Sequence, residues 1–200
     1  MPGSRPIRLP AVNFEQRELP FKMVSRLDVL RVHGLHRPAL QFRRNAAHRF
    51  SHPDAEGGLL YMSPDLETCL WECFGDTILD SGSMISRAAW ENRCLSRIVC
   101  ADVLKICDLT NLAVRRKLGL DLSALKHPDL VVPQAWGMAI QNHPERVDGI
   151  RYSSRFTAKP CMVVFERSGR QVRLTEEGLG ALPELDGASE FLEEHSIALV

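Results

Sequence analysis

The order in which apolar segments follow one another limits the folds open to this chain more than any other feature of its sequence. Segments with strand-like patterns are interleaved with segments of helical spacing, but without the regular strand–helix–strand rhythm of a doubly wound parallel sheet. We therefore predict a single domain of the α+β class. Strands are expected at residues 27–32, 59–62, 95–101, 103–109, 147–152 and 161–165, and helices at residues 64–74, 133–143 and 188–194.

The most informative of these segments is a predicted strand that passes through a turn into a helix. The apolar run Leu59–Met62 predicts a short buried strand. Ser63 is suited to cap a helix and Pro64 to occupy its first position. Apolar side chains then recur at helical spacing up to Phe74, and Gly75 is expected to end the helix.

Composition restricts the partners and the compartment of the protein. Its 200 residues carry 25 Lys and Arg against 25 Asp and Glu, so no net charge draws it to nucleic acid or to an anionic membrane. Six scattered cysteines without a CxxC pair indicate reduced, structural thiols and a cytoplasmic location. No apolar run is long enough to span a membrane. We expect an irregular N-terminal arm over residues 1–25 and the catalytic domain over residues 26–200.

The common catalytic and cofactor motifs are missing from the sequence. There is no glycine-rich dinucleotide or P-loop motif, no nucleophile elbow and no zinc-ligand spacing. Four histidines lie close together, but their spacing fits no standard metal template, and we predict no metal site; they are His33, His36, His48 and His52.

Four short pieces remain, and their order is distinctive. The first places an arginine inside an apolar strand, the second places an arginine before an aromatic residue, the third is the strand–turn–helix segment, and the fourth is rich in Asp, Gly, Tyr, Ser and Arg. They are Leu30–His33, Ala47–Phe50, Leu59–Glu72 and Val147–Arg155, the last followed by Phe165–Arg167. Together they resemble the RES-domain family, which is named for an Arg, a Glu and a Ser. The resemblance covers residues 27–167.

The resemblance implies a fold like that of ADP-ribosyltransferases and a site that acts on NAD⁺. It assigns Arg31 and Arg49 to the phosphates, which suits the forked donor geometry of a guanidinium. It places Tyr61 against nicotinamide or ribose. Glu72 matches the catalytic glutamate, which can stabilise the cationic ribose of the transition state or hold the ribose hydroxyls. Ser154 matches the family serine, which offers its hydroxyl to the nucleotide.

The same resemblance implies a function. The predicted catalytic residues are Glu72, Arg31 and Tyr61, and the predicted substrate-binding residues are Arg31, Arg49, Tyr61 and Ser154. Arg155 is an alternative to Arg49 as the second phosphate ligand. The expected protein is a toxin that cleaves the nicotinamide–ribose bond of NAD⁺ as a glycohydrolase or a phosphorylase.

In this reading NAD⁺ is a substrate, there is no cofactor, and phosphate is an optional co-substrate. A helix-turn-helix antitoxin is the expected partner, without direct contact to nucleic acid or membrane, and base rates favour a homodimer. Two alternatives stay open: an ADP-ribosyltransferase that modifies a protein, and a binding module without turnover. The sequence does not distinguish water, phosphate and a protein side chain as acceptors.

Overall fold

The computed structural model describes residues 8–44 and 47–200 of the chain, so the first part of the predicted N-terminal arm lies outside the described residues. The strands are β1 (Lys22–Gly34), β2 (Leu59–Met62), β3 (Met84–Ile85), β4 (Arg93–Asp108), β5 (Gly149–Ser153), β6 (Pro160–Phe165), β7 (Leu174–Ala181) and β8 (Ala198–Leu199). The α-helices are α1 (Leu66–Ser81), α2 (Arg87–Glu91), α3 (Leu112–Leu118), α4 (Leu122–Leu125), α5 (Val131–Gln141) and α6 (Asp186–Glu194). Two short 3₁₀ turns cover Phe14–Gln16 and Leu182–Glu184.

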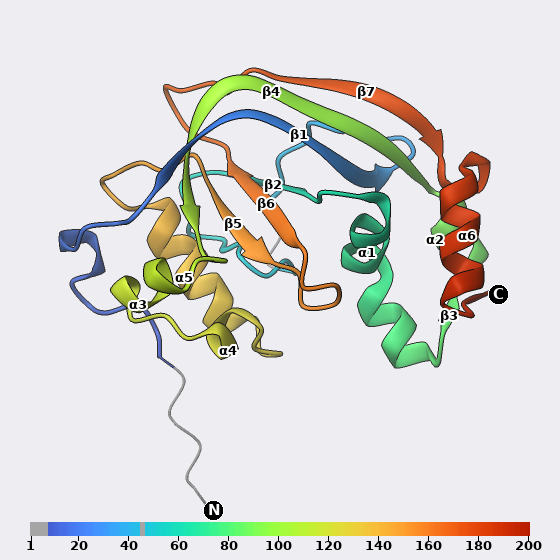
Figure 1. Cartoon of the computed structure of the whole chain (residues 1–200), viewed down its shortest axis with the longest axis horizontal. Helices are drawn as coiled ribbons and strands as arrows, with labels where there is room; N and C mark the ends of the chain where they lie inside the picture. Colours follow the sequence, from blue (N-terminus) through green and yellow to red (C-terminus); the bar gives the residue numbers. More distant parts are fainter. Residues whose placement is uncertain (1–7, 45–46) are drawn as a thin grey trace, which may run out of the picture.

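Within the described residues the chain forms one mixed sheet, and the predicted single α+β domain is confirmed. The strand order is β1-β4-β5-β6-β2, with β7 added beside β4. Only the β4–β5 pair is parallel in this sheet. The long strands β1, β4 and β7 arch over one side of the molecule, α3 to α5 lie near one end of the arch, and α6 lies at the other (Figure 1). A smaller sheet pairs β3 with β8.

Strand β4 is continuous where the sequence predicted two strands. The expected break near Ala101 is an irregularity in the β1–β4 ladder, where the pairing shifts from Ser25↔Val103 to Leu27↔Cys100. Arg26 absorbs the shift with a positive φ of 62°. The ladder therefore bends without ending, and β4 pairs with β7 before the irregularity and with β5 after it.

Helix α1 begins and ends later than the sequence predicted. Ser63 is not its cap, because the backbone of Ser63 is paired with Leu30; the Asp65 side chain caps the helix by accepting a 2.8 Å hydrogen bond from the Thr68 N–H. The helix also continues past Gly75 and ends at Gly82, whose φ is 69°. Gly75 serves packing, since a Cβ atom there would lie 2.5 Å from the Phe156 ring.

Three apolar clusters hold these elements together. One lies between the sheet and helices α3 to α5 and includes Trp136 and Phe50. A second lies along the concave part of the sheet and includes Leu60 and Ile98. A third joins α1 to α2 and α6 through side chains such as Phe74. No helix in the described part of the chain has the length and apolar character needed to cross a membrane.

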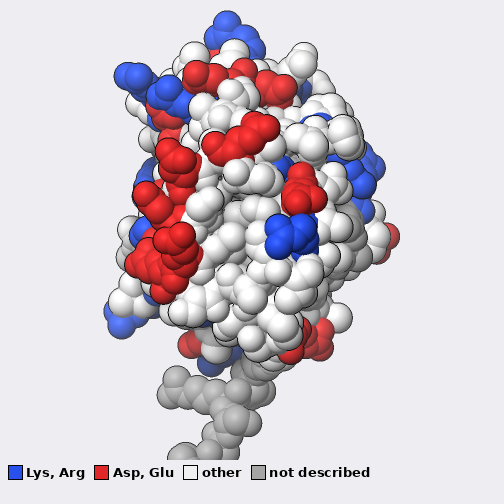
Figure 2. Space-filling view, turned by 90° about the vertical axis from the view of Figure 1, so that its right-hand side faces the viewer, with Lys and Arg blue, Asp and Glu red and all other residues white. Residues whose placement is uncertain are grey.

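Although the chain has no net charge, its charged side chains are unevenly distributed over the surface. The exposed face of α6 carries Asp186, Glu190, Glu193 and Glu194. Acidic side chains gather on the end of the molecule that includes this helix (Figure 2). Strand β7, which the sequence analysis missed, adds further acids and is mostly exposed. Its weak alternation of apolar and polar residues explains why it was missed.

The packing of α5 yields a stability prediction. Alanine is a better helix former than glycine, yet a Cβ atom at Gly137 would lie 2.3 Å from the Phe50 carbonyl oxygen, which is backbone and cannot rotate away. We expect Gly137→Ala to lower the free energy of unfolding by about 1–3 kcal/mol, the usual cost of overpacking. Urea denaturation measures this change.

Gly178 on β7 is the matched control, because a Cβ atom there would meet nothing within 4 Å and its φ is not positive. Gly178→Ala should leave the free energy of unfolding unchanged or raise it by up to about 1 kcal/mol. Equal stability in the two variants would contradict the close α5 contact.

Candidate active site

A cavity of about 810 Å³ opens between the arch of the sheet and helix α1. This volume lies in the range of roughly 300–1,000 Å³ that is usual for small-molecule sites. Strand β1, strand β2, helix α1, the start of β4 and the loop after β1 all contribute to its lining. Arg31, Tyr61 and Glu72, the three predicted catalytic residues, line this one cavity.

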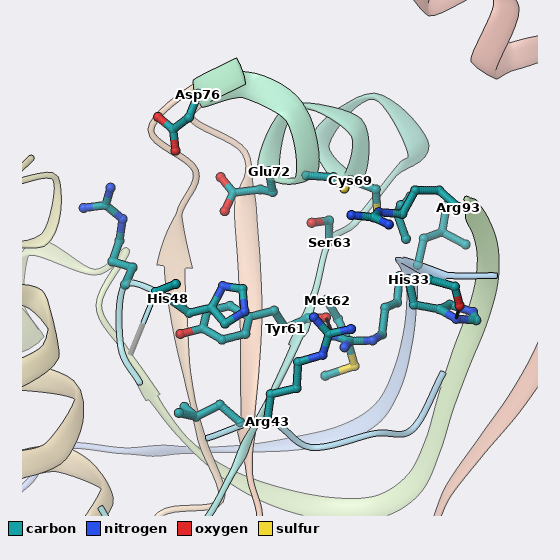
Figure 3. Close-up of a pocket in the computed structure, with 18 of the residues that line it drawn as sticks. His33, Arg43, His48, Tyr61, Met62, Ser63, Cys69, Glu72, Asp76 and Arg93 are labelled. Carbon is teal, nitrogen blue, oxygen red and sulfur yellow. Dashed lines mark hydrogen bonds between the residues drawn. The ribbon is translucent and has the colours of Figure 1, made fainter. Parts of the chain in front are cut away.

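Tyr61 stands at the centre of the cavity wall on β2. Its hydroxyl accepts a 3.0 Å hydrogen bond from the Phe50 N–H, and its ring lies 5.4 Å from the ring of His48. Figure 3 shows the two rings side by side, below the helix that carries Glu72. Burial raises the pKa of the Tyr61 hydroxyl above its ordinary value, so the ring stays neutral. It can offer an aromatic face to a ligand but not a phenolate.

Glu72 extends from α1 into the cavity, and two hydroxyl groups, one from β5 and one from the residue directly after it, hold its carboxylate. The Tyr152 hydroxyl donates to Oε2 at 3.0 Å and Ser154 Oγ donates to Oε1 at 2.7 Å. No described Lys, Arg or His forms an ion pair with this carboxylate. Burial, and then the Glu72 charge, raises the pKa of Tyr152, so Tyr152 remains a donor. Glu72 is thus an oriented carboxylate without an ion-pair partner among the described residues.

Ser154 occupies a different place from the one the family resemblance implied. Its side chain is fully buried and does not line the cavity. Besides donating to Glu72, its Oγ accepts from the Phe156 N–H at 3.2 Å and from the Thr157 N–H at 3.3 Å. These contacts place Ser154 behind Glu72, and the role in nucleotide binding that the resemblance implied stays a prediction.

Arg31 lies on the floor of the cavity with 7% of its surface exposed. Its Nη1 donates to the Tyr61 carbonyl at 2.6 Å, and its Nε is buried without a partner among the described residues. Burial, followed by repulsion from Arg43, lowers its pKa to about 10. At neutral pH it is therefore a buried cation that no described carboxylate pairs with, which is costly unless a ligand supplies the anion.

Arg49 and Arg155, the two alternatives for the second phosphate ligand, both contact other groups of the protein. Arg49 Nη1 donates to the Leu125 carbonyl at 2.6 Å and to the His127 carbonyl at 3.2 Å. Arg155 forms an ion pair with Asp76 and lies over the Phe156 ring. Both line the cavity near Glu72, but neither has a buried Nε without a partner among the described residues, as Arg31 has.

Sequence reasoning missed several cavity residues. Arg43 follows β1 in a loop, and Arg93 begins β4; both were hidden among many arginines without a pattern. Tyr152 lies in the Val147–Arg155 piece, where its spacing of two from Ser154 on a strand puts both side chains on one face. His48 lies in the Ala47–Phe50 piece and was read only as part of a histidine cluster.

Two cysteine thiols line the same cavity, and their pKa values are raised, which disfavours the reactive thiolate form. Cys69 and Cys73, one helical turn apart on α1, both reach it. Burial raises the pKa of the Cys69 thiol to about 12 and also raises that of Cys73. All six cysteines are unpaired. The described residues contain no group of three His, Cys, Asp or Glu side chains arranged to hold a metal ion.

The fold and the cavity define a class: an α+β domain with an oriented carboxylate and an unpaired buried arginine in one pocket. The chain belongs to the RES domain family, whose model matches residues 28–181. Among curated proteins, no sequence matches significantly. The fold is similar to that of a chain in the crystal structure of the M. tuberculosis MbcT–MbcA toxin–antitoxin complex, with a TM-score of 0.60 and 20% identity. The match covers 88% of this chain and 92% of that chain.

The isolation of Arg31 yields a prediction about stability. Replacing a buried charge by an apolar side chain of similar length is often stabilising, by about 1–4 kcal/mol. We expect Arg31→Met to raise the free energy of unfolding, measured by urea denaturation without ligand, by on the order of 1 kcal/mol. Arg97 on β4, which is exposed and paired with Asp28, is the control. Arg97→Met should change stability little, because exposed ion pairs contribute little to it.

The pH dependence follows from the lowered pKa of Arg31. The unfolded chain keeps this arginine protonated to a higher pH than the folded chain does. The cost of burying the charge is therefore fully present at neutral pH and declines only as the pH rises through about 10. A loss of stability in Arg31→Met at pH 7 would contradict this account, because it would mark the arginine as a structural group.

Proposed function

We propose that this protein cleaves the bond between nicotinamide and ribose in NAD⁺ and acts as the toxin of a toxin–antitoxin pair. The observation that carries the proposal is the Glu72 carboxylate, held by Tyr152 and Ser154 on the wall that faces Arg31 and Tyr61. A carboxylate that no cation neutralises is suited to stabilise positive charge, and a buried arginine without an anion is suited to bind phosphate.

The proposed reaction balances without a cofactor. The bond between the ribose C1′ atom and the nicotinamide nitrogen breaks, and its electron pair leaves with nicotinamide, which becomes neutral. The sugar is left as an oxocarbenium-like cation, and the Glu72 carboxylate stabilises it. Water then adds to C1′ and loses a proton to give ADP-ribose, or phosphate adds to give the 1-phosphate of that sugar.

The other cavity residues bind and orient the dinucleotide. Arg31 donates to the pyrophosphate through the groups that the Tyr61 carbonyl leaves unused. The neutral ring of Tyr61 packs against nicotinamide or ribose, and its hydroxyl, held by Phe50, keeps the ring in place. Ser154 and Tyr152 act through Glu72, because each donates a hydrogen bond to one of its carboxylate oxygens and so fixes the orientation of the group.

Transfer of ADP-ribose to a protein is the second candidate within the same chemistry. The donor half of the site is common to both reactions, and we place free turnover first because Glu72 lines a cavity of about 810 Å³ and not a flat surface on which a protein would dock. A binding module without turnover is disfavoured by the two hydroxyl donors that hold Glu72, since binding an anionic dinucleotide would be easier without that carboxylate.

The toxin assignment is supported by family membership and by the similar fold of a chain from a toxin–antitoxin complex. A protein that drains NAD⁺ harms its own cell unless it is blocked. We therefore propose a small cognate antitoxin that covers the cavity mouth and presents acidic groups to the arginines that line it.

Glu72→Gln tests the proposed chemistry. It keeps the size of the side chain but removes the negative charge. We expect turnover of NAD⁺ to fall on the order of 10²–10³-fold, the effect of removing one preorganised electrostatic group. NAD⁺ affinity, measured by calorimetry, should change little or improve, because the lost group acts mainly in the transition state.

Glu67 on the same helix is the control, since it is paired with Lys159 and does not line the cavity. Glu67→Gln should leave turnover unchanged and alter stability by no more than about 1 kcal/mol. Near-wild-type turnover in Glu72→Gln, with the fold intact, would remove Glu72 from the site.

A growth experiment tests the toxin role separately. Induced expression of the wild-type chain should arrest growth and lower cellular NAD⁺, because turnover is not stoichiometric and small amounts of enzyme suffice. The Glu72→Gln chain, expressed to the same level, should do neither. Unimpaired growth in cells that accumulate folded, active wild-type protein would argue against a toxin.

A further inference from the structure

The cavity has more positive charge at one end than the proposed substrate needs. Six arginines line it, namely Arg31, Arg37, Arg43, Arg49, Arg93 and Arg155, against two carboxylates, Glu72 and Asp76. Both carboxylates lie at the end that also holds Arg49 and Arg155, as the ion pair of Arg155 with Asp76 indicates. Four arginines thus share the other end without a carboxylate.

These four arginines are unpaired and close together. In the described part of the chain, none of Arg31, Arg37, Arg43 and Arg93 forms an ion pair. Arg43 Nε is buried without a partner, as is Arg31 Nε. The pKa of Arg43 is lowered by burial and then by Arg37 and Arg93, so the charges repel one another at short range. We call these four side chains the arginine cluster.

The cluster lies away from the reacting end of the cavity. In Figure 3 the side chains of Arg43 and Arg93 extend toward His33, to the right of the Tyr61 ring, whereas Glu72 and Asp76 lie above that ring, on α1. Arg31 is buried, Arg93 is half-buried and Arg37 is exposed, so the cluster extends from the floor of the cavity to its rim. A ligand with its nicotinamide ribose at Glu72 and its pyrophosphate at Arg31 would bring its adenosine half to Arg37 and Arg93.

Charge balance indicates what that adenosine half carries. The two phosphates of NAD⁺ bear one negative charge each, which match Arg31 and Arg43. A monoester phosphate adds about 1.5–2 further negative charges near neutral pH and offers several strong acceptors. Arg37 and Arg93 can supply the matching donors, and they would otherwise only repel Arg43.

We propose that the arginine cluster contains a subsite for a phosphate monoester on the adenosine ribose, so that the preferred substrate is the 2′-phosphorylated dinucleotide NADP⁺. This deepens and rests on the proposed function, because the orientation of the ligand follows from placing the reacting ribose at Glu72. Arg93 and Arg37 are the residues that determine the preference, and Arg31 and Arg43 hold the pyrophosphate common to both dinucleotides.

Binding of two adenosine fragments to the full chain tests the subsite without turnover. Adenosine 2′,5′-bisphosphate should bind the wild type roughly 10–100-fold more tightly than 5′-AMP, the range for a charge-assisted hydrogen bond. Arg93→Gln should remove most of this advantage, while 5′-AMP affinity stays within about threefold. Arg37→Gln at the exposed rim should reduce the advantage in the same direction, and its exposure protects this second test from a folding defect.

Arg97→Gln is the matched control, because Arg97 lies on the same strand as Arg93, is paired with Asp28 and does not line the cavity. It should keep the full preference for the bisphosphate. Equal affinity of the wild type for the two fragments would overturn the subsite. Binding of inorganic phosphate alone as tight as that of the bisphosphate, and equally dependent on Arg93, would also overturn it, because the cluster would then serve free phosphate.

Turnover separates the failure of this proposal from the failure of the proposed function. The wild type should cleave NADP⁺ with a kcat/KM at least tenfold above that for NAD⁺, and Arg93→Gln should bring the ratio close to one. Cleavage of neither dinucleotide, together with an Arg93-dependent preference for the bisphosphate, would refute the proposed reaction and leave the subsite standing. Cleavage of both at equal kcat/KM would refute the preference and leave the reaction standing.

Discussion

The site depends on one short contact between the first two strands. Leu30 and Ser63 exchange backbone hydrogen bonds of 2.8 and 2.9 Å, although β1 and β2 lie at opposite edges of the main sheet order. This bridge closes the arch, and the next residue, Arg31, donates to the Tyr61 carbonyl beside it. The bridge brings an arginine from β1, an aromatic ring from β2 and the start of α1 to one place.

The buried cations of the cavity lower the stability of the fold, and a bound anionic ligand would remove this cost. The protein has no net charge, yet cations concentrate in the cavity and acids on the α6 end (Figure 2). A buried arginine without an anion opposes folding, and the three apolar clusters offset that cost. Proteins tolerate such local violations of good packing mainly at functional positions, which makes the arginines better evidence for a binding site than their number alone.

The fold class was predictable from local patterns, whereas the candidate site residues came from the resemblance to the RES-domain family. The strand–turn–helix pattern predicts the elements that carry Tyr61 and Glu72, and the apolar strand predicts the element that carries Arg31, but only the resemblance singled out these residues. Three features were not local. Ser63 does not cap α1, because its backbone pairs with Leu30. The two strands predicted on either side of Ala101 form one continuous strand, with an irregularity opposite Arg26. The hydroxyl of the buried Ser154 donates to Glu72. Arg43 and Arg93 are far apart in the sequence and come together only in the folded chain. No local sequence pattern could therefore identify them as cavity residues.

The thiols on α1 lie where the proposed reaction would form a cationic sugar, which is an electrophile. A cationic sugar reacts with whatever nucleophile lies nearest, and a thiolate is among the strongest that a protein offers. Cys69 lies on the cavity wall one turn before Glu72, but burial raises its pKa to about 12 and keeps it as a weakly reactive thiol. In the proposed reaction, the packing of this helix therefore makes Cys69 a weaker competitor for the cationic sugar than a thiolate would be.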